Sequence, residues 1–545
     1  MAALHFRAMR SLKITSVIGG LVLAAGALFT AHPAAADGPT GPTPPAEFST
    51  DWHDPVTAAP PVATPGTRTC EVTLAATRFR DFTPYRGSYA PPKECGTGAR
   101  WNKVVLRLDG QVKGRQYDRL GYLALGGVEI LRTSTPEPSP DGISWSVEKD
   151  VTRYRDTLSR PQPVEMLIGN VVNETYTGVI DVRVTLTFHA AEGRVKPAAG
   201  TPDRVVPLTG ATLTTPRNTE RVLAEVYATG SGGGCEEFWY LTVPDAAPYS
   251  CKATDGPYRE VRISVDGKLA GIAAPFPHVW TGGWSNPFLW YVTPAPRAFD
   301  VQPITYDLTP FAALLNDGAA HRVEVSVAGV PAGQSGWSIP TNVLLWQDEG
   351  SEVVTGGLDR HEPGTPRNSA VYTAGSPDVL ETTGGDTLTV AGHLNTSHGR
   401  VATTVTRTVD HRSTHRWGAD ENPDALTARW TDDETVTVGR TATHTRRTYT
   451  MDGEIAVDGA NRLRTELTVG DRAAVDVVRN GKRLSWSRLD DTYTGDASFT
   501  LGVPRDQRHA VGTGTERYRL YGSAGCYDRS LTSVQGTVTE DLRRC

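Results

Sequence analysis

The sequence has no surplus of positive charge. Its 545 residues include 55 basic and 61 acidic side chains, a balance that argues against a general nucleic-acid-binding protein and against a polybasic membrane-surface protein. Beyond residue 36 it also lacks any run of about 18 apolar residues, the length that a membrane-spanning helix needs. We therefore expect neither nucleic acid nor a membrane to be a partner of the mature chain.

Familiar catalytic and cofactor motifs are missing as well. There is no Walker loop, no Gly-x-Gly-x-x-Gly after a strand, no Gly-x-Ser-x-Gly elbow, no His-Glu-x-x-His and no Cys-x-x-Cys. These absences argue against nucleotide binding, the common serine hydrolases and the usual zinc sites. His411 and His415 share one face of a strand-like stretch and could bind a metal, but histidines beside Arg412 and Arg416 are more often surface residues. We expect neither a metal nor a cofactor.

The first 36 residues have the pattern of a secretory signal peptide. A positively charged start is followed by an apolar stretch at 14–30, and Ala34-Ala35-Ala36 offers small residues at a cleavage site. An uncleaved membrane anchor is the alternative, which the Ala-x-Ala pattern disfavours. The segment predicts a secreted, extracellular protein.

The few cysteines fit an exported protein. Six cysteines fall into three local pairs that lie far apart, so pairing between nearest neighbours is the simplest of about 15 possible connectivities. Each bridge would stabilise the fold by roughly 3 kcal/mol. The predicted disulfides are Cys70–Cys95, Cys235–Cys251 and Cys526–Cys545.

Long helical patterns are scarce, and most of the chain has the pattern of short strands. Residues 179–186 alternate apolar and polar side chains, and 261–265 lead into Asp266-Gly267, a strong hairpin signal. The best helical candidates are short, at 151–158 and 309–315. The sequence therefore predicts an all-β protein.

The predicted organisation is two tandem jelly-roll or β-sandwich domains followed by a C-terminal antiparallel β-domain. Alternating, charge-rich strands in the last third suit sheets with one buried and one solvent-exposed face. The expected segments are a signal peptide at 1–36, a Pro-rich leader at 37–66, an N-terminal jelly roll at 67–190, a second jelly roll at 205–348 and the C-terminal β-domain at 350–545.

Acidic residues have an unusual sequence context at two places. Asp118 lies in 113–119, near Arg115 and Arg119, whose charges would keep it ionised for activating water or holding a polar substrate. A structural ion pair is the simpler alternative. Glu236 and Glu237 lie in a Gly-rich, cysteine-flanked loop among aromatic residues, a composition that suits a carbohydrate site. Here the alternative is a solvated loop with its aromatic rings in the core.

A third unusual stretch, Pro275 to Trp290, gathers three Trp, two Phe and three Pro within 16 residues. So much aromatic surface is costly to leave bare. The stretch is therefore either a packed edge of the core or an aromatic wall that faces a ligand.

Together these stretches resemble the glycopeptide amidase A family, the secreted plant and actinobacterial peptide N-glycanases of the PNGase A type. The resemblance runs in order through residues 65–350 and is weak in the C-terminal third. The motifs that carry it lie at 113–119, 125–132, 147–154, 175–178, 235–240, 258–261, 275–290 and 306–311.

The resemblance implies an amide hydrolase that cuts between a glycosylated asparagine and its first N-acetylglucosamine, giving aspartate and a glycosylamine without a metal. The family is similar, more distantly, to PNGase F, whose two jelly rolls hold the site between them. Tyr117-Asp118-Arg119 matches its Trp-Asp-Arg strand, and Cys235-Glu236-Glu237-Phe238 matches its Cys-Ala-Glu-Trp loop. Its third acid has no acidic match here, where Asn170 takes that place.

The resemblance and the residues together give Asp118 and Glu237 as the catalytic pair. Asp118 is the better base, while Glu237, beside Phe238 and Trp239, could act as an acid or bind a sugar hydroxyl. Glu129 is left out, because a hairpin at Gly126-Gly127 would place it about 20 Å along the strand from Asp118. The expected substrate-binding residues are Arg119, Asn170, Glu236, Trp239, Trp280 and Trp284.

Two other functions stay open at this point. One is an endo-acting glycosidase that cuts N-glycans between sugars with a carboxylate pair. The other is a carbohydrate-binding surface protein without catalysis. For the amidase, the expected partner is an N-linked glycopeptide or glycoprotein, and the expected state is a monomer.

Overall fold

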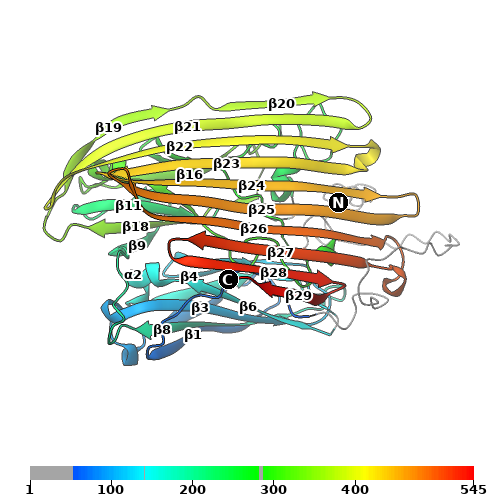
Figure 1. The fold of residues 1–545 in the computed structure, drawn as a ribbon, viewed down its shortest axis with the longest axis horizontal. Coiled ribbons are helices and arrows are strands. Elements are labelled where there is room, and N and C mark those ends of the chain that lie inside the picture. The colour runs from blue at the N-terminus through cyan, green and yellow to red at the C-terminus, as the bar shows by residue number, and fades with distance from the viewer. Residues whose placement is uncertain (1–52, 140, 233, 281–285, 335) are drawn as a thin grey trace.

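The structure is a computed structural model that describes residues 53–139, 141–232, 234–280, 286–334 and 336–545. The predicted signal peptide, most of the Pro-rich leader and Trp284 lie outside the described residues. Across the described part the chain folds into antiparallel sheets with a few short helices, which confirms the predicted fold class (Figure 1). None of the helices in this part is long and apolar enough to cross a membrane.

The N-terminal unit consists of two four-stranded antiparallel sheets around one core. Leu106, Leu123 and Val184 come from different strands and are all buried in the same apolar cluster. The first sheet has the order β1 (Thr69–Phe79), β8 (Ile180–Ala190), β3 (Trp101–Val112) and β6 (Ile143–Asp150). The second has the order β2 (Tyr85–Tyr89), β7 (Gln162–Ile168), β4 (Leu120–Leu125) and β5 (Val128–Ser134).

The second unit also has two four-stranded antiparallel sheets. The expected hairpin is present, because Asp266 and Gly267 both adopt the positive φ that a tight turn between β13 and β14 requires. One sheet has the order β10 (Thr212–Leu213), β16 (His321–Ala328), β13 (Glu260–Val265) and β14 (Lys268–Ala273). The other has the order β15 (Ile304–Asp307), β11 (Thr219–Val226), β18 (Thr341–Gln347) and β9 (Arg204–Pro207), and β12 (Thr229–Gly230) pairs with β17 (Trp337–Ser338).

The helices are short connections. The two predicted helical stretches are confirmed as η3 (Thr152–Tyr154) with α2 (Arg155–Leu158), and η7 (Thr309–Phe311) with α3 (Ala312–Leu315). The others are η1 (Lys93–Cys95), η2 (Gly98–Arg100), η4 (Cys235–Leu241), η6 (Pro287–Leu289), η8 (Ala419–Glu421) and η9 (Arg505–Gln507). Of these, η4 carries the acidic loop that the sequence singled out.

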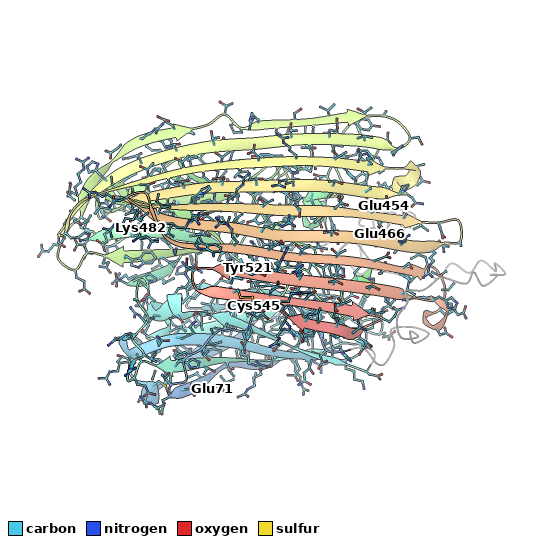
Figure 2. The ribbon with its side chains drawn as sticks, viewed as in Figure 1. Glu71, Glu454, Glu466, Lys482, Tyr521 and Cys545 are labelled. Atoms are coloured by element: carbon cyan, nitrogen blue, oxygen red, sulfur yellow. A yellow bond between two sulfur atoms is a disulfide. The ribbon has the colours of Figure 1, made fainter. Side chains whose placement is uncertain are left out.

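The C-terminal third forms one 11-stranded antiparallel sheet of long strands, drawn in yellow-green to red in Figure 1. Alternate residues of its strands are buried, and Glu454, Glu466 and Lys482 are exposed on it (Figure 2). The strands run from β19 (Thr355–Pro363) through β21 (Asp378–Thr396), β22 (Gly399–Trp417), β23 (Asp424–Val438), β24 (Thr441–Val457), β25 (Arg462–Arg479), β26 (Lys482–Thr500), β27 (Val511–Gly522) and β28 (Gly525–Val534) to β29 (Thr537–Arg543), and β20 (Arg367–Thr373) pairs with β21.

This large sheet shares its core with the second unit. One continuous cluster of buried apolar side chains includes Val261 and Trp290 from the second unit and Trp430 and Leu467 from the large sheet. Tyr493 on β26 donates a hydrogen bond to the Leu289 carbonyl (2.6 Å). The predicted boundary near residue 350 therefore divides two sheets that lie on one common core.

The described part of the leader and the disulfides fasten the chain at both ends. The Ala58 amide donates to Glu516 on β27 (2.6 Å), so residues 53–66 reach the large sheet. The three predicted disulfides are confirmed: Cys70–Cys95, Cys235–Cys251 and Cys526–Cys545. Three disulfides are typical of proteins that fold in the secretory pathway.

Candidate active site

Asp118 lies in the loop between β3 and β4, half-buried at the point where β4 begins. The Arg119 and Thr135 backbones continue the β4–β5 ladder, since the Thr135 amide donates to the Arg119 carbonyl (2.9 Å). Successive side chains along a strand point to opposite faces. Asp118 thus falls on the same face as Leu120 and Tyr122, the face that is turned away from the core residue Leu123.

The expected positive neighbour of Asp118 is in place. Arg119 is close enough for electrostatic attraction to Asp118, and its Nη2 donates to Gln116 Oε1 (2.5 Å). Burial lowers the pKa of Arg119, while the negative charge of Asp118 acts in the opposite direction. The Arg115 guanidinium lies over the Tyr176 ring, 5.6 Å from its centre. The loop therefore presents a carboxylate in a positively charged, partly buried setting.

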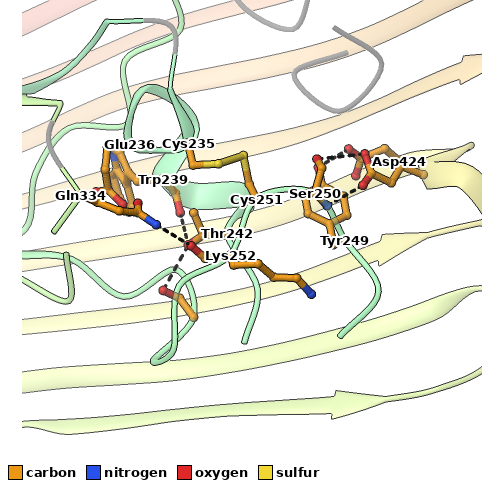
Figure 3. Close-up of a disulfide and its surroundings, with 12 residues drawn as sticks. Cys235, Glu236, Trp239, Thr242, Tyr249, Ser250, Cys251, Lys252, Gln334 and Asp424 are labelled. Atoms are coloured by element: carbon orange, nitrogen blue, oxygen red, sulfur yellow. Dashed lines mark hydrogen bonds between the residues drawn. A yellow bond between two sulfur atoms is a disulfide. The ribbon is translucent and has the colours of Figure 1, made fainter. Parts of the chain in front are cut away.

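Glu236 has a different role from the substrate contact that the sequence suggested. Its side chain is 1% exposed, and its carboxylate accepts hydrogen bonds from Arg259 Nη2 (2.6 Å), Arg259 Nε (2.9 Å) and Trp337 Nε1 (2.6 Å). This buried ion pair fixes η4 to the segment just before β13, within the second unit. The disulfide Cys235–Cys251 fastens the same loop (Figure 3).

Glu237 follows directly in η4 and is half-buried. Consecutive side chains of a 3₁₀ helix are about 120° apart, so Glu237 points in a different direction from its buried neighbour. Its amide donates to the Gly234 carbonyl (3.0 Å), which keeps it within the first turn of η4. The loop therefore buries one acid as an anchor and keeps the other at its surface.

Two more expected substrate contacts are structural residues. Trp239 is 2% exposed and packs among Tyr240, Trp337 and Trp430, so it belongs to the core. Asn170 is fully buried, and its Nδ2 donates to the carbonyls of Phe79 (2.9 Å) and Gly178 (3.2 Å). Neither side chain is free to bind a sugar.

Trp280 belongs to a cluster that contacts the segment after Asp118, and it also bonds to β12, which lies against η4. Leu120, two residues after Asp118, packs against the buried cluster of Tyr227, Trp280 and Val301. The indole of Trp280 faces β12 and donates to the Gly230 carbonyl (3.4 Å). Gly230 in turn lies against the Glu236 backbone so closely that a Cβ there would be 2.1 Å from its carbonyl oxygen.

The described part of the aromatic stretch 275–290 is an edge of the core. Trp280 is only 4% exposed and stacks on His278 with the rings 4.6 Å apart. Burial lowers the pKa of His278 well below its usual value, which keeps this ring neutral. Phe276 packs on Tyr449 (5.1 Å between ring centres) in the large sheet. The stretch therefore joins the site region to the C-terminal sheet.

A cleft of about 570 Å³ opens beside this region, between β2, β4, β5 and β7 of the first unit and residues 338–340 of the second. Glu129 lines it but is held by Arg132 (2.7 Å), whose Nη1 donates to Thr229 on β12 (2.6 Å). The pairing of Glu129 with Ala124 is as expected. Among the residues that line it, the polar and charged ones are Arg86, Tyr122, Glu129, Arg132, Glu165 and Ser338.

Sequence reasoning missed Glu137. It follows β5 and lies so close to Asp118 that the charge of Asp118 raises its pKa, in addition to a larger effect of burial. The β4–β5 register would have indicated this neighbour. It pairs Leu120 with Ser134 and hence brings the residues after 135 next to Asp118. A bulge between Leu123 and Ala124 hides this register in the sequence.

The histidines considered for metal binding are core residues. His411 is 2% exposed and stacks on Trp430 (5.1 Å), and His415 Nε2 is 2.7 Å from Asp424. Within the described ranges, the group with metal-ligand spacing is formed by Glu220, Asp348 and His398, on segments that carry neither Asp118 nor Glu237.

Comparison with known proteins identifies the family. The family model of peptide N-acetyl-beta-D-glucosaminyl asparaginase amidase A (PNGaseA) matches residues 60–363, more than half of the chain. The chain belongs to this family. The matched residues include the Asp118 loop, η4 and Trp280, whereas most of the C-terminal sheet lies beyond them.

A PNGase A relative is the peptide-N4-(N-acetyl-beta-glucosaminyl)asparagine amidase A of Prunus dulcis, 31% identical over 339 residues. The alignment covers 55% of this chain and 58% of the relative, so the chain spans little more than half of that protein's length. Two solved structures of PNGF-II, in space groups C2 and P2₁, align with 14% identity and TM-scores of 0.35 and 0.33. They cover 51% and 55% of this chain and 65% and 64% of their own, and this likeness is too low to carry an argument.

Proposed function

We propose that the protein is a secreted, monomeric, actinobacterial peptide N-glycanase of the PNGase A type. It hydrolyses the amide bond between asparagine and the first N-acetylglucosamine of N-linked glycopeptides or glycoproteins. Membership of the PNGase A family supports this activity. It is supported by two half-buried acids, Asp118 and Glu237, that come from two different β-units: Leu120 beside Asp118 packs against the cluster that contains Trp280, and Trp280 donates to Gly230, which lies against the η4 backbone.

Asp118 acts as the base in this proposal. An amide is a poor electrophile, so the attacking water has to be positioned and deprotonated as it adds to the carbonyl carbon. A carboxylate beside the positively charged Arg119 guanidinium can accept that proton. Its half-buried position strengthens its electrostatic influence on a bound water molecule.

Glu237 either protonates the leaving nitrogen or binds the sugar. The leaving nitrogen needs a proton, and the N-acetylglucosamine needs fixed hydrogen-bond partners. Glu237 is held in place by η4, which the Glu236–Arg259 ion pair and the Cys235–Cys251 bridge fasten. These carboxyl groups suffice for the chemistry, so we propose that the reaction needs no metal.

The test is the mass of the peptide after incubation with a defined N-glycopeptide. An amidase leaves aspartate in place of the glycosylated asparagine, an endoglycosidase leaves one sugar on asparagine, and a binding protein leaves the glycopeptide intact. Activity that persists after treatment with EDTA supports metal independence. A peptide that keeps one sugar, or the whole glycan, overturns the proposed function.

Two substitutions test the assigned pair. Asp118→Asn and Glu237→Gln should each lower turnover by at least about a hundredfold while the fold stays intact, because each removes a group that handles a proton or fixes the substrate. Turnover numbers are compared with wild type, with circular dichroism as the control for folding. Near-wild-type turnover in either variant removes that residue from the site.

A further inference from the structure

We propose that Glu137 is the proton donor to the leaving amide nitrogen and forms, with Asp118, a carboxyl pair that carries one proton. The inference rests on the proposed amide hydrolysis. It assigns a catalytic acid that neither the sequence motifs nor the family match singles out. Glu237 is then left to hold the sugar.

The backbone holds Glu137 against the Asp118 loop from both sides. Before it, the Thr135 amide donates to the Arg119 carbonyl (2.9 Å), and the Arg119 amide donates to Thr135 Oγ1 (3.0 Å). After it, the Ser139 carbonyl accepts from the Gly114 amide (3.3 Å). Pro136 and Pro138 flank Glu137, and their fixed φ angles stiffen the short segment between these ties.

The surroundings of Glu137 favour its neutral form. Burial raises its pKa well above the usual value, and the negative charge of Asp118 raises it further. Arg119 and Arg115 act in the opposite direction, and Tyr117 also faces the group. Tyr176 packs on Tyr117 at 5.2 Å between ring centres and faces Arg119. Neighbouring carboxyl groups do not both ionise readily, so we place one proton on the pair, on Glu137, whose neutral form its surroundings favour.

Glu137 also differs from the structural acids of the region. Glu236 and Glu129 are each gripped by an arginine through two hydrogen bonds. For the Glu137 carboxyl group, the described residues provide no hydrogen bond. An acid that is held in position by its backbone but has no fixed partner can give its proton to a substrate.

The proposed step balances in protons and bonds. As the water oxygen bonds to the amide carbonyl carbon, Asp118 accepts a proton from that water. The carboxylic acid of Glu137 gives its proton to the amide nitrogen, and the carbon–nitrogen bond breaks. The glycosylamine leaves as a neutral amine, the asparagine has become a carboxylic acid, and transfer of the proton from Asp118 to Glu137 restores the pair.

The experiment compares Glu137→Gln with Glu220→Gln. Glu220 is a matched control, because it is also a half-buried acid whose pKa is raised by burial and by other acids, but it lies on β11 beside His398. The kcat and KM for an N-glycopeptide are measured across the acidic and basic range. Wild type should lose activity at high pH, where Glu137 is ionised. Glu137→Gln should lower kcat by about a hundredfold or more, with little change in KM, and should abolish this basic limb. Glu220→Gln should match wild type.

A wild-type rate, or a retained basic limb, in Glu137→Gln overturns the proposal. If Glu137→Gln does not fold, as judged by circular dichroism, the Glu137→Asp variant is measured instead. It keeps a titratable acid, so the loss of activity at high pH should persist but at a shifted pH. A pH profile and rate identical to those of wild type overturn the proposal. Wild-type enzyme that never converts asparagine to aspartate overturns the proposed function as well. If asparagine is converted to aspartate at the same rate with and without the Glu137 carboxyl group, only this assignment is overturned.

Discussion

Two adjacent glutamates on one short helix have opposite environments. Glu236 is buried against Arg259 and Trp337, whereas Glu237 is half-buried at the loop surface. A buried ion pair is expensive to break on one side, because the remaining charge stays in a poorly solvated site. The two residues should therefore respond differently to the same substitution.

Glu236→Gln should lower the thermal midpoint strongly, since it leaves Arg259 buried without its counter-charge, a cost of about 3–5 kcal/mol. Glu237→Gln should leave the midpoint nearly unchanged and act on turnover instead. Thermal melts of both variants beside wild type make the comparison. Equal shifts in the two midpoints would contradict the assignment.

A buried histidine gives the stability a dependence on pH. Burial lowers the pKa of His411 to about 3, and the charge of Arg259 adds to this effect. In the unfolded chain the pKa is near ~6.5, so the unfolded state binds the proton first as pH falls. The stability from neutral His411 is complete above about pH 6.5 and is lost progressively as pH falls towards about 3.

His411→Phe should make stability less sensitive to acid, because phenylalanine keeps a ring against Trp430 but does not titrate. The difference in pH dependence should amount to at most about 1.4 kcal/mol per pH unit within that window. Thermal midpoints at neutral and acidic pH measure it for both proteins. A variant that loses as much stability as wild type on acidification contradicts this explanation.

At the scale of elements, the loops that carry the candidate site are fixed by contacts outside the strands. The η4 loop combines the Cys235–Cys251 bridge with the Glu236–Arg259 pair, and Ser250 donates through its amide to Glu421 (2.5 Å). By contrast, Cys526 and Cys545 are exposed at the end of the chain. The two bridges should therefore matter for different properties.

Replacing Cys235 and Cys251 together by serine should reduce kcat by about tenfold or more, because small displacements of a catalytic group are costly. Replacing Cys526 and Cys545 together should leave kcat near the wild-type value. Steady-state kinetics on both double variants, at a temperature where each is folded, separate the effects. A larger loss of kcat in the terminal pair would show that η4 does not position the site.

For the whole molecule, the C-terminal sheet is part of the core of the second unit. Arg407 on β22 is buried with Asp432 (2.7 Å) and donates to the Thr305 carbonyl (3.1 Å). Arg297 pairs with Asp471 on β25 (2.6 Å). Removing the sheet would uncover these charges together with the apolar residues of the shared core.

A chain that ends at Gln347 should therefore fail to fold, although it keeps Asp118, Glu137 and Glu237. The exposed core surface and the unpaired Arg297 account for the loss. Yield of soluble protein and near-ultraviolet circular dichroism report the outcome, with a chain of residues 53–545 as the folded control. A truncated chain that folds and cleaves a glycopeptide would show the sheet to be accessory.

The sequence by itself determined the features that local patterns encode. Two-residue alternation and turn residues gave the β class and the Asp266-Gly267 hairpin, and cysteines close in the sequence formed the three disulfides. The motif order gave the family, which the match over residues 60–363 bears out. These features depend on neighbours within a few tens of residues, so a single sequence is enough to find them.

Only the tertiary structure decided what each polar residue does. Glu236 is held by Arg259 and by Trp337, which is 101 residues away in the sequence, while Glu137 meets Asp118 through a strand register that a bulge conceals. Trp239 and Asn170 are residue types that often occur in sugar-binding sites, but segments distant in the sequence enclose both side chains. Burial and charge pairing depend on which distant segments pack together, and no local pattern contains that information.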